Sequence, residues 1–91
     1  PKGIVVNVAR GSIVDTGSLV QALEKGSIGG AGLDVVEGTE ADRKALCRME
    51  NVVLTPHISG HTHESIKRQN ALICDIVNAH FSGKPFKNRV V

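Results

Sequence analysis

The sequence has no tryptophan or tyrosine, and only two of its 91 residues are phenylalanine. Basic and acidic residues nearly balance, 11 against 9, and form no block of one sign. Without a basic face and aromatic side chains that stack on bases, we expect no nucleic-acid partner. The two cysteines, Cys47 and Cys74, fit no metal-ligand spacing and are too few for a disulfide-stapled fold. We expect both to be buried or half-buried thiols in a reducing compartment.

Long apolar runs are also missing. No stretch approaches the roughly 20 apolar residues that span a membrane, and no signal peptide opens the chain. We therefore expect a cytoplasmic protein without a membrane partner. The apolar fraction of 41% is that of a folded domain rather than a disordered segment. The chain starts at Pro1 without an initiator methionine, so we expect a part of a longer protein.

Strand and helix signals alternate along the chain. A continuous apolar run rich in β-branched residues predicts a strand over residues 3–9 that is covered on both faces. We expect further strands over residues 29–36 and 52–55. The second strand is glycine-rich at its start, where close packing against a neighbour would exclude side chains. Between the strands we expect a helix that Asp15 or Thr16 caps and Gly26 ends, and a short helix over 41–49. A longer amphipathic helix over 62–82 precedes an extended tail to Val91. This order predicts an α/β fold with three parallel strands, half of a doubly wound sheet.

Polar side chains follow each predicted strand. Arg10 comes after the first, Asp34 and Glu37 after the second, and His57 after the third. Ligands of doubly wound folds bind beyond the carboxyl ends of the strands, so we expect these four side chains to meet at one edge. Taken singly, each could be a surface charge or a turn residue. The sequence has no Gly-x-Ser-x-Gly elbow for a serine hydrolase, and its histidines lack the further ligands of a metal site, so we predict no metal.

Three motifs in this order resemble the D-isomer-specific 2-hydroxyacid dehydrogenase family: VNVARGSIVD (6–15), GAGLDVVE (30–37) and NVVLTPHISG (51–60). The resemblance covers essentially the whole chain. It implies that residues 1–61 form the C-terminal half of a Rossmann-type dinucleotide-binding domain. Residues 62–91 would be a crossover helix and tail that pack on a substrate domain. The implied activity is hydride transfer between NAD or NADP and a small 2-keto or 2-hydroxy acid, in a homodimer.

The resemblance also implies roles for single residues. Arg10 would bind the carboxylate and carbonyl of the substrate, for which a planar guanidinium is suited. His57 would be the general acid–base, since the ordinary pKa of imidazole lies near neutral pH. Asp34 would accept a hydrogen bond from the nicotinamide carboxamide. The pocket for that ring would be lined by Arg10 and His57 together with Val8, Ala9 and Gly60.

One position departs from the family pattern. The family places a glutamate five residues after the aspartate, followed by proline, and this carboxylate pairs with the catalytic histidine. Here the fifth residue is Thr39, and Glu40 stands where proline is expected. Three alternatives remain: Glu40 serves through a shift of one residue, Glu37 reaches the histidine, or the partner is lost. We favour Glu40 as the third catalytic residue.

The family's phosphate-binding loop, Gly-x-Gly-x-x-Gly, occurs nowhere in the 91 residues. We therefore expect the chain to need an N-terminal portion and to be inactive alone. The leading hypothesis is a fragment of an NAD(P)-dependent oxidoreductase. An alternative is a dinucleotide-sensing interaction protein of the same fold without significant turnover. A third is a self-sufficient α/β interaction domain.

Overall fold

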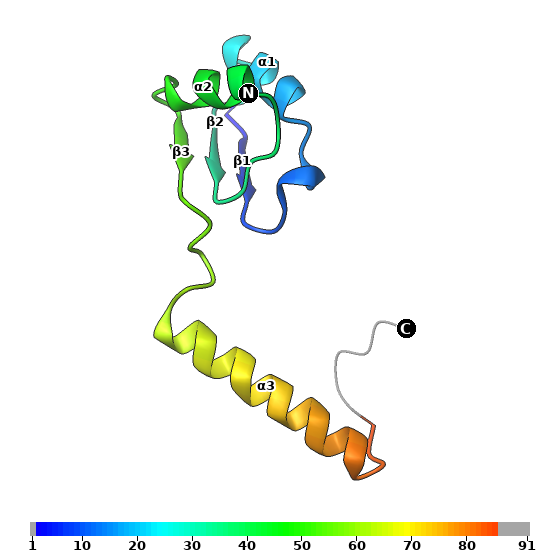
Figure 1. Ribbon diagram of the computed structural model, residues 1–91. Helices are drawn as coiled ribbons and strands as arrows, with labels where there is room; N and C mark the ends of the chain where they lie inside the picture. The colour runs from blue at the N-terminus through cyan, green and yellow to red at the C-terminus, as the bar shows by residue number, and fades with distance from the viewer. Residues whose placement is uncertain (1, 86–91) are drawn as a thin grey trace. The chain divides into compact units, whose positions relative to one another are not determined.

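The computed structural model describes residues 2–85 and divides the chain into two compact units, Pro1–Ser59 and Gly60–Val91. The first unit is built on a parallel sheet of three strands, β1 (Ile4–Asn7), β2 (Gly30–Leu33) and β3 (Val52–Leu54), in the order β1-β2-β3 (Figure 1). All three carboxyl ends therefore lie at one edge of the sheet. The predicted α/β fold with three parallel strands is confirmed.

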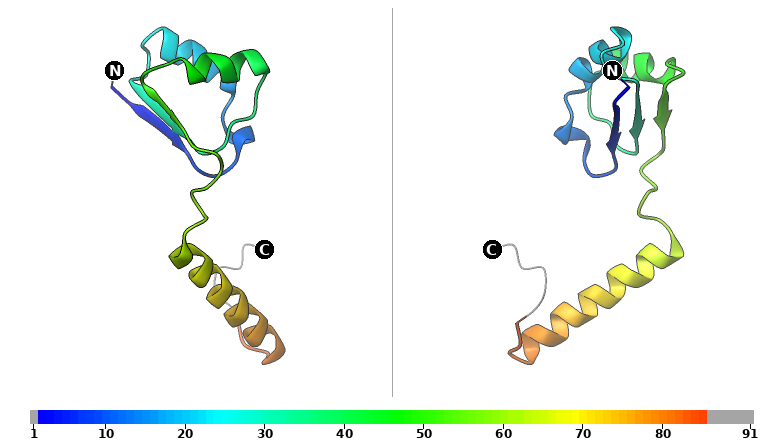
Figure 2. Two further views of the ribbon diagram at one scale, coloured as in Figure 1. Left: turned by 60° about the vertical axis from the view of Figure 1, so that its left-hand side comes forward. Right: turned by 180° about the vertical axis from the view of Figure 1, so that it is seen from behind.

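Two helices and one 3₁₀ turn connect the strands. The turn η1 spans Gly11–Ile13, and the helices are α1 (Thr16–Glu24) and α2 (Glu40–Cys47). Asp15 caps α1, since its side chain accepts a hydrogen bond from the backbone N–H of Ser18 at 2.7 Å. Both helices lie over the same face of the sheet (Figure 2). The predicted helices are present, and α2 starts one residue earlier than expected.

The core of the first unit lies between this face and the two helices. Leu46 of α2 is its most enclosed large side chain, at 1% exposure. Side chains alternate between the two faces of a strand, so β2 contributes Ala31 and Leu33 to the core. Apolar positions of α1 complete the cluster: Leu19, Val20 and Leu23.

The opposite face of the sheet is uncovered among the described residues. Ile4 is 69% exposed and Val53 65% exposed, and Val6 is as exposed as Ile4. The apolar run of β1 predicts cover on both faces, whereas within residues 2–85 helices cover only one. The physical reason is local: α1 and α2 both connect strands across the same face, and no described element of the first unit lies over the other.

Close packing explains the glycines at the start of β2. A β-carbon added at Gly30 would lie 2.6 Å from the backbone oxygen of Asn51, which belongs to the segment leading into β3. No side chain fits at that distance. The prediction that close packing excludes side chains at the start of this strand is thus confirmed.

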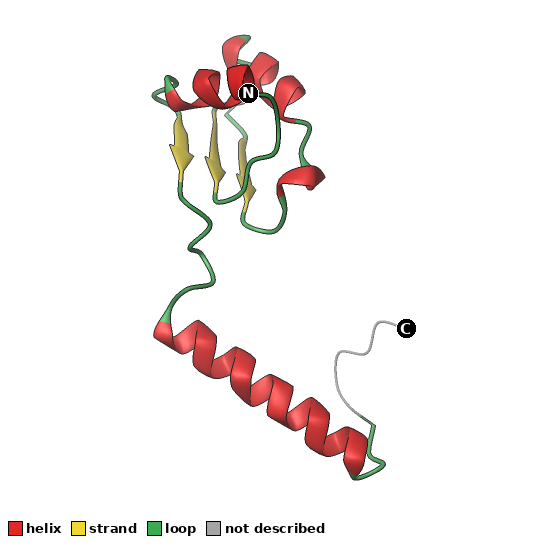
Figure 3. Ribbon diagram, in the orientation of Figure 1, coloured by secondary structure: helices red, strands yellow, loops and turns green. Residues whose placement is uncertain are grey.

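The second unit contains one long helix, α3 (His63–Phe81), coloured red with the other helices in Figure 3. The Thr62 hydroxyl caps it by accepting from the backbone N–H of Ser65 at 3.0 Å. Within the described residues, the apolar stripe of α3 is not buried, and Ile73 and Phe81 are among its exposed members. No described helix is both long and apolar enough to cross a membrane. The predicted tail falls largely on residues 86–91, outside the described part.

Both cysteines are exposed, so the prediction of buried or half-buried thiols is wrong. Cys47 is the last residue of α2 and follows Leu46, the residue that points into the core. Cys74 lies on α3, where none of the helical residues is buried. Cysteine is commonly buried, but here its position on each helix decides otherwise.

Candidate active site

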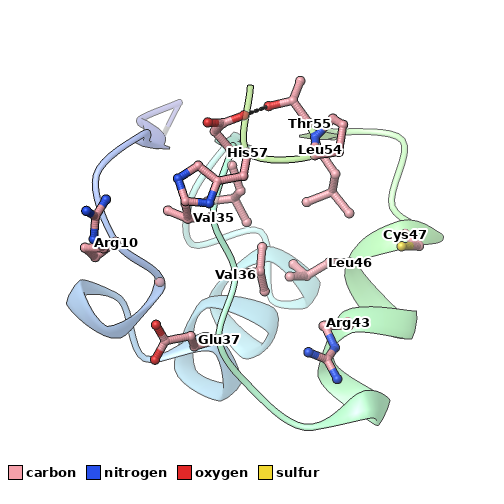
Figure 4. Close-up of a pocket in the computed structure, with 14 residues that line it drawn as sticks. Arg10, Val35, Val36, Glu37, Arg43, Leu46, Cys47, Leu54, Thr55 and His57 are labelled. Atoms are coloured by element: carbon pink, nitrogen blue, oxygen red, sulfur yellow. Dashed lines mark hydrogen bonds between the residues drawn. The ribbon is translucent and has the colours of Figure 1, made fainter. Parts of the chain in front are cut away.

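A cleft of about 420 Å³ opens at the carboxyl ends of β2 and β3. Figure 4 shows Arg10 and Glu37 on one side and Arg43 and Cys47 of α2 on the other. The polar groups that the sequence analysis expected to meet at this edge line it together: Arg10, Asp34, Glu37 and His57. The cleft floor is apolar and includes Leu33, Val36, Leu46 and Leu54. A charged rim over an apolar floor is typical of a small-molecule site.

Asn7, the last residue of β1, holds the segment that carries Arg10. It is buried, and its side-chain Nδ2 donates to the backbone oxygen of Arg10 at 2.8 Å. Its Oδ1 accepts from the backbone N–H of Ala9 at 3.1 Å. Its own backbone oxygen accepts from the N–H of Asp34 at 2.9 Å. One buried amide therefore fixes the turn after β1 beside the carboxyl end of β2.

Arg10 itself is exposed at the cleft. Its Nη1 donates to the backbone oxygen of Ala9 at 2.7 Å, which leaves other guanidinium donors for an anion. Val8 and Ala9 are exposed on the same segment. Gly60 is the first residue of the second unit and is described with that unit. The predicted ring-pocket role of these three residues stays a prediction.

Asp34 is buried, at 4% exposure, and its carboxylate accepts hydrogen bonds from its own chain. Its Oδ1 accepts from the Thr55 hydroxyl at 2.5 Å and from the N–H of Ile58 at 2.9 Å. Its Oδ2 accepts from the N–H of Ser59 at 3.0 Å. The Thr55 hydroxyl holds the pKa of Asp34 far below its ordinary value, the two amides act in the same direction, and burial opposes them. Asp34 is thus a buried anion at neutral pH.

His57 lies in the segment that follows β3, three residues after Leu54, and its side chain is exposed in the cleft. Its backbone φ is 57°, and it is the one described residue other than glycine with positive φ. Its N–H donates to the backbone oxygen of Asp34 at 3.1 Å. Left-handed backbone is costly for a residue with a β-carbon and is often found at functional positions.

The two candidate glutamates occupy different places. Glu37 lines the cleft with Arg10 and His57, and its backbone oxygen accepts a hydrogen bond from the buried hydroxyl of Thr16. Glu40 stands in the first turn of α2, outside the cleft lining, and pairs with Lys44 at 2.6 Å in an exposed ion pair. The structure therefore brings Glu37, rather than Glu40, together with the other predicted residues.

Thr39 fixes where α2 begins. Its hydroxyl accepts from the N–H of Asp42, whose side chain accepts in turn from the N–H of Thr39, so the two form a capping box. The sequence carries this signal as Thr-x-x-Asp at 39–42. Counting residues from Asp34 does not use this signal and so gives no reason to place Glu40 on a helix. Asn7, Thr16 and Thr55 were also missed.

Glu37 lies directly against Gly11, where there is no room for a side chain. A β-carbon at Gly11 would lie 2.6 Å from both Cγ and the backbone nitrogen of Glu37. We expect Gly11→Ala to lower the free energy of unfolding by about 1–3 kcal/mol, because backbone must move to admit the methyl group. Urea unfolding of the 91-residue chain measures this. Gly3→Ala is the matched control, since its β-carbon would meet nothing within 4 Å. Equal stability of the two variants would contradict the prediction.

Comparison with known proteins identifies the family. The family described as "D-isomer specific 2-hydroxyacid dehydrogenase, NAD binding domain" matches residues 1–59, almost two thirds of the chain. The chain belongs to this family. The resemblance noted in the sequence is thereby confirmed, and the family is one of oxidoreductases.

Individual relatives match nearly the whole chain. It is 46% identical over 91 residues to hydroxyphenylpyruvate reductase of Plectranthus scutellarioides, covering 100% of this chain and 29% of that protein. The NAD complex of a D-isomer specific 2-hydroxyacid dehydrogenase from Lactobacillus delbrueckii ssp. bulgaricus matches with a TM-score of 0.73 and 33% identity, over 97% of this chain and 31% of its own. A third match is NADPH-dependent glyoxylate/hydroxypyruvate reductase of Sinorhizobium meliloti in complex with NADP and malonate. Its TM-score is 0.69 and its identity 38%, and the match covers 100% of this chain and 31% of that one. The chain thus spans under a third of these relatives.

Proposed function

We propose that these 91 residues supply the acid–base and substrate-binding end of a site that interconverts 2-keto and 2-hydroxy acids with NAD or NADP. The observation that carries the proposal is that Arg10 and His57 line one and the same cleft at the carboxyl ends of parallel strands. Ligand sites of doubly wound sheets lie at this edge. The relatives named above are reductases and dehydrogenases of this kind.

In this proposal the bound dinucleotide supplies or accepts the hydride. Arg10 binds the substrate carboxylate through paired N–H donors and so holds the carbonyl in place. His57 would donate a proton to the carbonyl oxygen during reduction and take that proton back from the hydroxyl during oxidation. The proton and the hydride together account for the two hydrogens that convert the ketone to the alcohol.

The residues present fit the nicotinamide end of such a cofactor. Asp34 is an ionised acceptor that lines the cleft at the sheet edge, and because a carboxylate oxygen can accept more than one hydrogen bond, a carboxamide N–H would find an acceptor here. The phosphates and the ribose need a glycine-rich loop that is not among these 91 residues. We therefore propose that the chain is inactive alone and that this loop is supplied from outside it.

We also propose a division of roles between the two parts, residues 1–61 as half of the dinucleotide-binding domain and residues 62–91 packing on a substrate domain. The compact unit that ends at Ser59 and the exposed apolar side chains of α3 support this. A cytoplasmic location and a homodimer stay predictions.

A hybrid enzyme tests the proposed function. In it, these residues replace the matching 29% of the hydroxyphenylpyruvate reductase of P. scutellarioides. We expect the hybrid to oxidise NADH or NADPH with a 2-keto acid and the 91-residue chain alone to be inactive. Arg10→Gln in the hybrid should raise KM for the keto acid about 10- to 150-fold, the range for losing hydrogen bonds to a charged group.

The controls separate this proposal from the sensor alternative. Lys84→Gln removes a positive charge beyond α3 and should leave KM unchanged. A hybrid that binds NADH tightly but reduces none of glyoxylate, hydroxypyruvate and hydroxyphenylpyruvate would favour a dinucleotide-sensing protein. An Arg10→Gln hybrid with an unchanged KM would refute the role of the guanidinium.

We propose Glu37 for the carboxylate role that the sequence analysis gave to Glu40. The support is that Glu37 lines the cleft with His57, whereas Glu40 pairs with Lys44 outside it. Glu37→Gln in the hybrid is expected to lower kcat/KM about tenfold, which corresponds to about 1.4 kcal/mol of lost charge stabilisation. Glu40→Gln should change it less than twofold, because this carboxylate lies outside the cleft lining and pairs with Lys44. The reverse pattern in steady-state assays would restore Glu40 to the role.

A further inference from the structure

The backbone around His57 is tied to one residue. The Thr55 hydroxyl and the N–H groups of Ile58 and Ser59 all donate to the carboxylate of Asp34. The N–H of His57 donates to the backbone oxygen of the same aspartate. Four donors from residues 55–59 therefore converge on Asp34, from both sides of His57. Asp34 lies 21 to 25 positions earlier in the chain, directly after the neighbouring strand β2.

These bonds account for the unusual conformation of His57. A φ of 57° is unfavourable for histidine, so a free turn of this sequence would relax to other conformations. In the observed turn the N–H groups of Ile58 and Ser59 both donate to the Asp34 carboxylate, so these bonds favour the conformation that residue 57 adopts. The anchor at Asp34 is in turn rigid, because it is buried and its N–H donates to Asn7 in β1.

We propose that Asp34 is a positioning residue for His57: its carboxylate fixes the 55–59 turn and so orients the imidazole toward the cleft lined by Arg10. This inference rests on the proposed function. It assigns Asp34 a task within the protein, separate from any contact with the nicotinamide. The Thr55 hydroxyl helps to hold the same turn through its bond to Asp34, and this bond can be removed without changing either His57 or the carboxylate.

The first test measures the turn in the 91-residue chain. Thr55→Val keeps the side-chain shape and removes the hydroxyl. We expect amide hydrogen exchange of Ile58 and Ser59, followed by NMR, to become at least about tenfold faster, since loosening the turn opens both bonds. Thr55→Ser retains the hydroxyl and should restore slow exchange. Thr39→Val is the matched control: it removes another hydroxyl-to-carboxylate bond, 2.6 Å long, at the start of α2, and should leave both amides unchanged. Unaltered exchange in Thr55→Val would overturn the proposal.

The second test measures catalysis in the hybrid enzyme. Thr55→Val is expected to lower kcat about tenfold with KM for NADH unchanged, and to raise the solvent deuterium isotope effect on kcat, because a misaligned imidazole slows proton transfer. Thr55→Ser should recover most of kcat. A merely structural defect would reduce the number of NADH-binding sites per chain and leave the isotope effect unchanged.

The outcomes separate the two levels of inference. If Thr55→Val keeps kcat and the isotope effect of the parent hybrid, Asp34 does not position His57, although the proposed function stands. If replacing His57 itself leaves turnover intact, the proposed function fails, and the positioning role fails with it. The test of the proposed function with His57 variants and the test of positioning with Thr55 variants can each be performed, and can each fail, without the other.

Discussion

Replacing His57 with glutamine in the hybrid enzyme is expected to lower kcat for 2-keto acid reduction by about 10²- to 10⁴-fold, the usual contribution of a positioned general acid. Glutamine keeps a polar side chain of similar size and can donate a hydrogen bond, but it cannot transfer a proton near neutral pH. Binding should survive, because the neighbouring Arg10 is retained on a separate turn held by Asn7. The measurement is single-turnover oxidation of NADH with saturating keto acid, which separates chemistry from product release.

Two comparisons make this result specific to His57. His80→Gln changes an exposed histidine in the last turn of α3 and should leave kcat unchanged. His57→Gln should also change the free energy of unfolding very little, by about as much as His80→Gln does or slightly more. The reason is that the imidazole ring of His57 is exposed and that the bond to Asp34 comes from the backbone N–H, which glutamine retains. Turnover within threefold of the parent enzyme would remove the imidazole from the mechanism.

The residues of the cleft could be predicted because strand order alone brings them together. Arg10, Asp34 and His57 each follow a strand, and parallel pairing places all three carboxyl ends at one edge. That step needs only the alternation of apolar strands and amphipathic helices. The position of the site at this edge therefore follows from the topology of the three parallel strands.

The residues that hold these groups in place could not be predicted in the same way. Thr55 reaches Asp34 across 21 positions, and Thr16 reaches Glu37 across the same separation. Such bonds depend on the register between β2 and β3 and on where each helix starts, which periodicity does not specify. Asn7 did carry a local signal, since an asparagine side chain commonly bonds to the backbone two residues on.

The choice between Glu37 and Glu40 shows how one cap changes an interpretation. Counting residues from Asp34 makes Glu40 the nearest match to the family's glutamate. The capping box of Thr39 and Asp42 instead starts α2 at Glu40 and directs its carboxylate to Lys44. Glu37 remains in the irregular segment that Gly11 and Thr16 hold at the cleft. Local helix chemistry thus outweighs the residue count.

Leu46→Ala is expected to lower the free energy of unfolding of the first unit by about 2–5 kcal/mol, the cost of losing buried methyl groups and leaving a cavity. At 1% exposure, Leu46 is the most enclosed large side chain among the described residues. It joins α2 to the sheet and also forms part of the cleft floor. Urea unfolding of the 91-residue chain, followed by far-UV circular dichroism, gives the change directly.

Two further variants decide whether packing at this position is the cause. Leu46→Met conserves volume and should cost less than about 1.5 kcal/mol. Val53→Ala removes methyl groups from the uncovered face of the sheet, where the side chain is 65% exposed, and should cost far less than Leu46→Ala. If all three variants unfold at the same urea concentration, α2 is not packed on the sheet through Leu46. The cleft between α2 and the strand ends would then lack its wall, and the site built on Arg10 and His57 would lose its structural basis.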